Sequence, residues 1–216
     1  MIQLFNEDTL GLVGRLRRYK VVSLFLEALD CHNHETFEHS LAVGYLGVDL
    51  GISLGFREES LRLLGTGLLL HDIGKLRINR NILDKPGKLN ESELGMMHKH
   101  PLYGYKALEG VVLNGIDMLD VRKLVISHHE YHKAHPYIRD GDERRRNHRI
   151  ERPRRNMNGR IQTLKQIVSV CDLVEALDSE RVYKPDLVKR EVEAITRRDF
   201  TGNPKYIDAV LERIYD

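Results

Sequence analysis

The sequence predicts an all-α protein with a single domain, and three observations support this fold class. Apolar residues recur at helical spacing through most of the chain, most clearly from Ile161 to Leu177. The 216 residues include only 6 prolines and no tryptophan, which disfavours a turn-rich β fold. With 41% hydrophobic and 31% charged residues, the chain has the composition of an ordinary globular domain. We expect a helical extension over residues 1–33 and the main domain over residues 34–216.

Composition and charge also narrow the possible environments and partners. The net charge of +2 is too close to neutral to indicate a nucleic-acid-binding protein. No apolar run approaches the ~18 residues that a membrane span needs, and the first residues lack the pattern of a signal peptide. Cys31 and Cys171 are too few for a disulfide framework, so we expect two buried thiols. These features predict a cytoplasmic protein that binds no membrane.

The first half of the chain predicts three long helices. Residues 10–29 form an amphipathic segment with a basic face, which we interpret as a packed helix rather than a membrane-surface helix. A second helix opens within residues 31–40 and ends near residues 50–51, and a third covers residues 56–70. Beyond a loop at 77–90, Asn90 with Glu93 predicts an N-cap and capping box that start another helix.

The second half returns to helices after one irregular stretch. A helix is expected to begin with Pro101 in its first turn, and another over residues 121–127. Periodicity fails over residues 131–159, where the segment 144–155 holds seven arginines and one acid. This stretch is either a solvated excursion or an electropositive flap beside a phosphorylated substrate. A long helix follows from residue 161, and two closing helices surround a turn at residues 202–204.

The motif around which the chain is organised follows the apolar run that ends at Leu70. His71 and Asp72 come directly after it, and both are good metal ligands. A carboxylate beside an apolar run is costly unless something pairs with it. Helical geometry would place Lys75 one turn further on, on the same side. A bound divalent cation explains the motif, and the alternative is a helix end that carries a stray His and Asp near an exposed Lys.

Further candidate ligands stand at other helix positions. Glu35 and His39 are one helical turn apart and share a face. Asp172 borders the apolar stripe of the long helix, so it too requires a cation. Two adjacent histidines, His128 and His129, end a buried element, which favours metal ligation over a pair of core histidines.

One position remains open on local grounds, because either His98 or His100 could be the ligand before Pro101. The set of candidate metal ligands comprises Glu35, His39, His71, Asp72, His100, His128, His129 and Asp172. These donors exceed what one ion needs, so we expect two or three ions, with Asp72 as the catalytic carboxylate that bridges them. Mixed imidazole and carboxylate ligands suit Fe or Mn, with Zn, Co or Ni as alternatives. Such a pair of ions is suited to phosphoester hydrolysis without a protein nucleophile.

In order and spacing, these motifs resemble the HD superfamily of metal-dependent phosphohydrolases, and within it the HD-GYP cyclic-di-GMP phosphodiesterases. The resemblance runs from about Glu35 to Lys184. The segments that carry it are His71–Lys75, Ile82–Leu89, His100-Pro101, His128–Glu130 and Val170–Leu177.

The resemblance implies roles for individual residues. It prefers His100 over His98 as a ligand, and it assigns Glu35 to members with a three-metal centre. Lys75 corresponds to a residue near the scissile phosphate. Arg181 and Lys184 correspond to residues that hold a phosphate or guanine of the dinucleotide.

The name-giving motif of the relatives is absent. After His128-His129-Glu130 the chain continues with Tyr131–Tyr137 and the arginine-rich stretch instead of reaching Gly-Tyr-Pro. Because little chain precedes Glu35, we expect regulation from elsewhere, for which a regulatory protein partner is one route. The expected activity is hydrolysis of a nucleotide phosphodiester, with cyclic-di-GMP as the first choice. The alternatives are another nucleotide phosphohydrolase and an inactive nucleotide-binding or partner-docking module.

Overall fold

A computed structural model describes residues 5–133, 157–183 and 189–215, and within α10 it leaves out the side chains at 157–158 and 180–183. The described residues form α-helices, one 3-10 helix (η2) and two isolated β-bridges, which confirms the all-α class. The helices are α1 (Glu7–Arg17), α2 (Lys20–His32), α3 (His34–Ser53), α4 (Glu58–Leu70), η2 (Ile73–Arg77), α5 (Arg80–Leu83), α6 (Glu91–Met97), α7 (His100–Ala107), α8 (Met118–Ser127), α10 (Met157–Tyr183), α11 (Lys189–Asp199) and α12 (Lys205–Tyr215).

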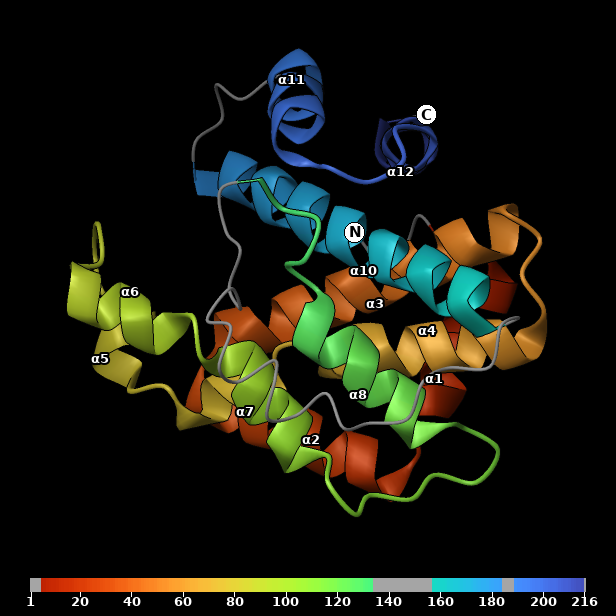
Figure 1. The fold of residues 1–216 in the computed structure, drawn as a ribbon, viewed down its shortest axis with the longest axis horizontal. Helices are drawn as coiled ribbons and strands as arrows, with labels where there is room; N and C mark the ends of the chain where they lie inside the picture. The colour runs from red at the N-terminus through yellow and green to blue at the C-terminus, as the bar shows by residue number, and fades with distance from the viewer. Residues whose placement is uncertain (1–4, 134–156, 184–188, 216) are drawn as a thin grey trace.

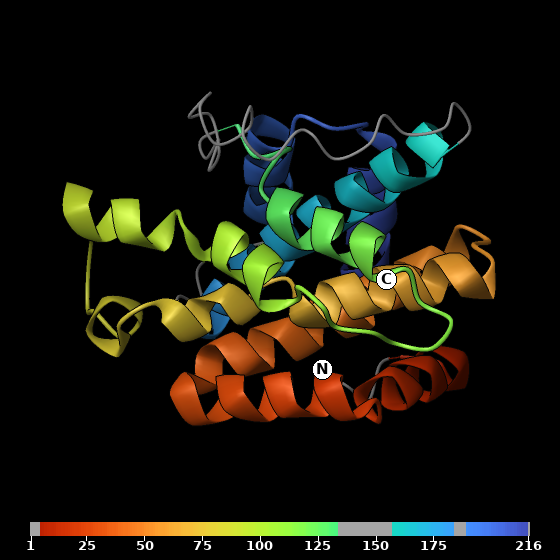
Figure 2. The same cartoon turned by 60° about the horizontal axis from the view of Figure 1, so that its bottom comes forward.

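The helices pack in layers around α3 and α4, which lie side by side in the middle of the molecule (Figures 1 and 2). On one side α1 and α2 cover this pair, and on the other side α8 and α10 do so. The short helices α5 and α6 extend away from the bundle, while α11 and α12 pack on α10. This arrangement brings the ends of α4 and α8 to the same region as the middle of α10.

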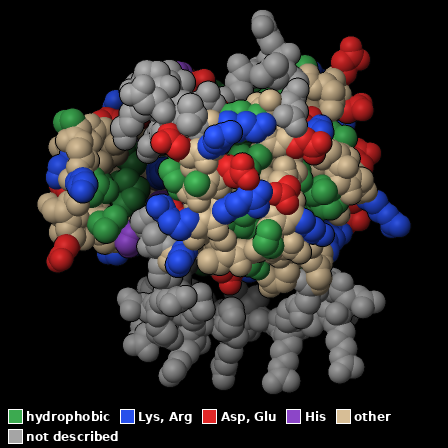
Figure 3. Space-filling view, turned by 90° about the horizontal axis from the view of Figure 1, so that it is seen from above, with side chains coloured by type: hydrophobic (Ala, Val, Ile, Leu, Met, Phe, Trp, Pro, Cys, Tyr) green, Lys and Arg blue, Asp and Glu red, His purple; other side chains and the backbone are tan. Residues whose placement is uncertain are grey.

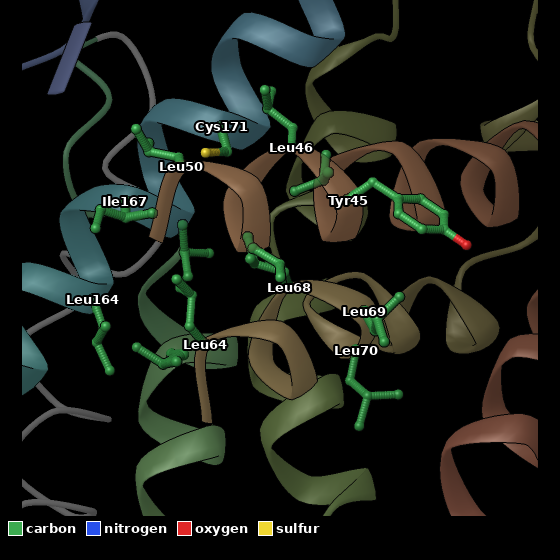
Figure 4. Close-up of a cluster of buried hydrophobic side chains, with 14 of the residues drawn as sticks. Tyr45, Leu46, Leu50, Leu64, Leu68, Leu69, Leu70, Leu164, Ile167 and Cys171 are labelled. Carbon is green, nitrogen blue, oxygen red and sulfur yellow. The ribbon is translucent and has the colours of Figure 1, made fainter. Parts of the chain in front are cut away.

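Leucines dominate the core between these layers. Leu64, Leu68 and Leu69 of α4 are completely buried. Figure 4 shows part of this core, with Leu50 of α3 next to Cys171 of α10. α3 approaches α4 closely because it carries Gly47, where a Cβ atom would overlap the side chain of Leu68. The tight packing holds the apolar run that leads into His71 in a fixed position.

The surface carries charges of both signs. Figure 3 shows a face on which acidic and basic side chains are interspersed. Arg197 of α11, for example, pairs with Glu193 on the same helix and with Asp208 of α12. This mixture agrees with the small net charge of the chain. In the part of the chain that the structure describes, no helix has the length and apolar character that a bilayer span requires.

Two expectations from the sequence are wrong. The segment expected to be one helix over residues 10–29 is split, because α1 ends at Arg17 and Tyr19 takes an extended conformation as the N-cap of α2. The break allows Leu16 and Val22 both to be buried, each on its own helix. Cys31 is exposed rather than buried, because it lies on the outer face near the end of α2.

Several local signals are confirmed. Asn90 and Glu93 form the capping box that starts α6, and Pro101 lies in the first turn of α7. The helices around residues 202–204 are α11 and α12. The loop at 77–90 contains the short helix α5, whose start is capped by Asn79. The arginine-rich residues 144–155 lie outside the described residues.

Candidate metal centre

Five segments of the chain deliver a cluster of histidines and carboxylates to one place: α3, the junction of α4 and η2, the start of α7, the end of α8 and the middle of α10. His71 is the C-cap of α4 and Asp72 follows it at the start of η2. His39 lies on α3, His100 begins α7, and Asp172 lies on α10. Within the described residues, four groups of three donors have ligand atoms within 4.8 Å of one another. These groups are His39–His71–Asp172, His71–Asp72–His128, His100–His128–His129 and His129–His132–Asp172.

The close approach of η2 to α7 positions Asp72 beside His100. Gly74 makes this approach possible, because a Cβ atom there would overlap the carbonyl oxygen of His100 and lie 2.5 Å from the nitrogen of Gly104. α4 does not continue as an α-helix through the motif, so Lys75 lies on a 3-10 turn. It still reaches Asp72, since its Nζ donates a hydrogen bond to Asp72 Oδ2 at 2.6 Å.

Three of the histidines are oriented in the same way. Each has its Nδ1 within hydrogen-bond distance of the carbonyl oxygen three residues earlier, and a carbonyl only accepts, so each Nδ1 carries a proton and donates it. The pairs are His71 with Leu68 at 2.7 Å, His100 with Met97 at 2.7 Å and His128 with Val125 at 2.6 Å. In the neutral imidazole the remaining lone pair is then on Nε2, which in each case points into the cluster.

The nitrogens of two of these rings face each other across Asp72. His100 Nε2 lies 3.0 Å from His128 Nε2, and Asp72 Oδ1 lies 3.2 Å and 3.8 Å from these two atoms. Asp72 Oδ1 is buried and accepts no hydrogen bond. When both rings are neutral, these three atoms are electron-pair donors with no proton between them, so they repel one another. A buried oxygen without a partner also costs about 1–3 kcal/mol. A cation among these three atoms would remove both penalties.

A second carboxylate serves the other side of the cluster. Asp172 Oδ1 lies 3.0 Å from His39 Nε2 and 3.6 Å from His71 Nε2. His39 Nδ1 donates a hydrogen bond to Glu175, a carboxylate that the sequence reasoning missed. A carboxylate behind a histidine fixes the ring and makes its other nitrogen a stronger ligand. Glu175 is three residues after Asp172 on α10, so helical spacing was the signal that could have identified it.

The carboxylates dominate the electrostatics of His39 and His71. Burial lowers the pKa of His39, but hydrogen bonds with Asp172 and Glu175 outweigh it and raise the pKa to about 9. Burial also lowers the pKa of His71, and the charge of Asp72 together with Asp172 raises it to about 10. These rings therefore occupy positions where the surrounding charge favours a cation, either a proton or a metal ion.

The two histidines after α8 have lowered rather than raised pKa values. Burial, together with the neighbouring histidines, holds the pKa of His128 and of His129 well below the usual value. Burial would raise the pKa of Asp72, but Lys75 and His71 hold it well below its usual range. At His128 and His129 the cluster therefore places neutral imidazoles beside ionised carboxylates, and a neutral imidazole is the form that binds a metal ion.

The remaining predicted residues lie in several places. The donor groups include His100 and not His98, which is only partly buried. Glu35 is exposed in the first turn of α3, one turn before His39, and none of the groups among the described residues includes it. The side chain of Arg181 and the whole of Lys184 lie outside the described residues. His132, which the sequence reasoning did not select, joins the cluster.

Fold and donor set together define the class of protein: a helical domain whose core ends in a cluster of imidazole and carboxylate donors. The chain belongs to the HD domain family, because the model of that family, described as HD domain, matches residues 36–177. This confirms the family resemblance that the motifs indicated.

Curated relatives with similar sequences are named for one type of reaction. The cyclic di-GMP phosphodiesterase PA4108 of Pseudomonas aeruginosa is 31% identical, over 77% of this chain and 36% of its own length. The cyclic di-GMP phosphodiesterase response regulator RpfG of Xanthomonas campestris pv. campestris is 31% identical, over 95% and 47%. The 3'3'-cGAMP-specific phosphodiesterase 1 of Vibrio cholerae is 29% identical, over 90% and 40%. The chain thus spans less than half the length of these three relatives.

A solved structure shares the fold. The HD domain of the L. monocytogenes phosphodiesterase PgpH, in complex with cyclic-di-AMP, aligns with a TM-score of 0.58 and 15% sequence identity. The alignment covers 88% of this chain and 94% of that domain. At this identity the likeness extends to the helical architecture.

Proposed function

We propose that the protein is a metal-dependent phosphodiesterase that hydrolyses a cyclic dinucleotide. The observation that carries this proposal is the convergence of His100 Nε2, His128 Nε2 and Asp72 Oδ1 in one buried position, while the Nδ1 atom of each ring donates to a backbone carbonyl. The relatives named above act on cyclic di-GMP or on 3'3'-cGAMP, which supports the substrate class. Cyclic-di-GMP is the substrate we propose within it.

The donor set fits two divalent ions, with Asp72 between them. One would be held by His39, His71 and Asp172 and the other by His100, His128 and His129, and Asp72 has an oxygen toward each side. Five imidazoles with carboxylates favour Fe or Mn over Ca or Mg, with Zn, Co or Ni as alternatives. Such ions supply Lewis-acid polarisation of the phosphate and a hydroxide at neutral pH. Glu35 is proposed as a ligand to a third ion, next to His39.

The residues around the cluster would bind and orient the substrate. Lys75 has a side chain that is 21% exposed, so its ammonium group reaches solvent while it holds Asp72. From this position it can donate hydrogen bonds to a phosphate oxygen placed against the cluster. His71 and Asp72 are almost completely buried, so they would contribute ligand atoms from the protein interior. We propose Arg181 and Lys184, which follow Asp172 along the chain, as the groups that hold a second phosphate or a guanine.

The experiment compares four substrates with one preparation of protein purified without air. Cyclic di-GMP, 3'3'-cGAMP, cyclic-di-AMP and a nitrophenyl phosphodiester are each incubated with the metal-loaded wild-type protein and with Arg181→Ala. We expect wild-type hydrolysis of cyclic di-GMP, and affinity lower by about 10–150-fold in the variant, because a charged hydrogen bond contributes about 1.5–3 kcal/mol. The nitrophenyl substrate should respond far less. Equal small effects on all substrates would contradict the dinucleotide assignment, and no hydrolysis would contradict the activity.

A further inference from the structure

His132 lies three residues after His129 and is buried, with 8% of its surface exposed. It forms a fourth donor group with His129 and Asp172 in which the ligand atoms all lie within 4.8 Å of one another. The two ions of the proposed function do not involve this residue. Its position differs from that of the other histidines, because it reaches the cluster from the segment that follows α8 rather than from a long helix.

The tautomer of His132 is fixed by the backbone of α10. Its Nε2 lies 2.8 Å from the carbonyl oxygen of Ser169, and a carbonyl only accepts, so Nε2 carries the proton and donates it. In the neutral ring the lone pair is then on Nδ1. Three other histidines of the cluster are fixed by a backbone carbonyl in the same way, with the two ring nitrogens exchanged. His132 therefore shares the arrangement that is typical of metal-ligating histidines.

The lone pair of His132 points at other donors. Its Nδ1 lies 3.0 Å from His129 Nδ1, which in turn lies 3.4 Å from Asp172 Oδ2. Asp172 is 5% exposed, and its Oδ2 is buried without a hydrogen-bond partner. Ligands at about 2.0–2.2 Å from one ion are about 3–4 Å from each other. The distances of 3.0 Å and 3.4 Å therefore match atoms that share an ion.

A hydrogen bond between the two rings is the competing explanation. A proton on His129 Nδ1 would bond to His132 Nδ1 at this distance, but it would leave Asp172 Oδ2 unsatisfied inside the protein. An ion among the three atoms would satisfy all of them. Two imidazoles and one carboxylate are a set that suits Fe(II), and also Zn(II), with positions left open for water or substrate.

The backbone holds His132 in place for this role. The segment pairs with the end of α11 in an antiparallel bridge between His132 and Phe200. On either side of His132, Lys133 N donates to Asp199 O at 2.7 Å and Thr201 N donates to Tyr131 O at 2.8 Å. Both the main chain and the Nε2 atom are therefore fixed, so Nδ1 is pre-organised toward His129 and Asp172.

We propose that His132 is an additional metal ligand of this chain, and that its Nδ1 shares a divalent ion with His129 Nδ1 and Asp172 Oδ2. A neutral imidazole has one lone pair, so His129 serves this ion, and the second ion of the proposed function keeps His100, His128 and Asp72. The inference rests on the metal centre of the proposed function, and it adds a ligand that the motifs do not contain. His132 lies just after His128-His129-Glu130, where this chain departs from the Gly-Tyr-Pro motif.

Two substitutions of His132 separate ligation from the structural hydrogen bond. In His132→Gln the amide reaches the position of Nε2, so the bond to Ser169 is kept and the lone pair at Nδ1 is lost. In His132→Asn the amide oxygen reaches the position of Nδ1, so a weak ligand is kept and the bond to Ser169 is lost. His32→Gln is the matched control, because His32 Nε2 also faces a backbone carbonyl, that of Ile78 at 2.9 Å, and belongs to none of the donor groups.

The measurements are metal per chain after anaerobic purification, affinity for Fe(II) and Zn(II) by competition with a chelator, and melting temperature without metal. We expect His132→Gln to lose one ion, or to bind it at least about 10–100-fold more weakly, the loss typical even for residues that only support a ligand. His132→Asn should keep more metal but melt at a lower temperature without metal. The His32 control should keep the wild-type metal content.

The outcomes distinguish this inference from the proposed function. A wild-type protein that binds no metal would contradict the whole metal centre. A wild-type protein with metal and hydrolytic activity, together with unchanged metal content and affinity in His132→Gln, would overturn the role of His132 alone. If Gln keeps more metal than Asn, the bond to Ser169 is what matters, and the ligand role is also overturned.

Discussion

Lys75 Nζ donates a 2.6 Å hydrogen bond to Asp72 Oδ2, and so fixes the carboxylate while its other oxygen faces His100. The Lys75 side chain is partly exposed and the Asp72 side chain is not, so the pair connects the buried donors to the surface that a substrate would approach.

This relationship predicts separate effects on binding and hydrolysis for Lys75. Lys75→Ala should lower kcat/KM for cyclic di-GMP by about 10–150-fold, the loss expected for one charged hydrogen bond of about 1.5–3 kcal/mol. Because the other oxygen of Asp72 faces His100 and His128 and would itself be held by a bound ion, the metal content should change little. Steady-state kinetics and metal analysis on the same samples check both statements. If the variant loses its metal and keeps its activity on added metal, Lys75 is a support for Asp72 rather than a substrate contact.

Glu175 should influence the metal centre through His39. Glu175→Gln removes the negative charge that holds the His39 ring, so metal affinity should fall by about 10–100-fold. Chelator competition measures this affinity. Glu38→Gln is the matched control, because Glu38 is an exposed residue of α3 beside His39 and is absent from the donor groups among the described residues. Equal affinities for the two variants would show that Glu175 does not support the centre.

Gly74 should be essential for the geometry of the site. A side chain there would overlap the His100 carbonyl, so Gly74→Ala should force η2 away from α7, with a loss of about 1–3 kcal/mol in the free energy of unfolding. Metal content should fall as well, because the motion separates Asp72 from His100. Gly95→Ala is the control, since its Cβ would meet nothing within 4 Å. Denaturant unfolding that gives the same stability for both variants would contradict the packing argument.

Metal removal should destabilise the fold. The donors come from five elements far apart in the sequence, so bound ions connect helices that otherwise meet only through side-chain packing. A ligand present at 1,000 times its Kd adds about 4.1 kcal/mol, which corresponds to a melting-temperature difference on the order of 10 °C for a chain of this size. Calorimetry with and without a chelator measures it. If chelation leaves the melting temperature unchanged, bound metal does not stabilise the fold, which would contradict this prediction.

Much of this architecture follows from local signals. Helix positions were predictable because apolar periodicity and caps act within a few residues, as in the capping box of Asn90 and Glu93. The motif at His71 and Asp72 was recognisable because the two donors are adjacent. The break at Tyr19 was not predictable, since both sides of it are amphipathic and only packing against the core separates them.

The roles of Glu175 and His132 depend on contacts between residues that are distant in the chain. Glu175 reaches His39 because α10 packs on α3, although the two residues are 136 apart in the chain. His132 is likewise fixed by Ser169 and by the end of α11. Helical spacing places Glu175 on the same face as Asp172, whereas no local pattern separates His132 from a surface histidine.

The central claim is that Asp72 and its neighbouring histidines hold metal ions, and metal analysis of anaerobically purified protein tests it most directly. We predict at least two divalent ions per chain in the wild type, and fewer in Asp72→Ala, because the carboxylate that faces both donor groups is gone. The His98→Ala variant should keep the wild-type value, since the donor groups contain His100 instead. Wild-type protein without bound metal, or an Asp72→Ala variant with unchanged metal content, would contradict the account.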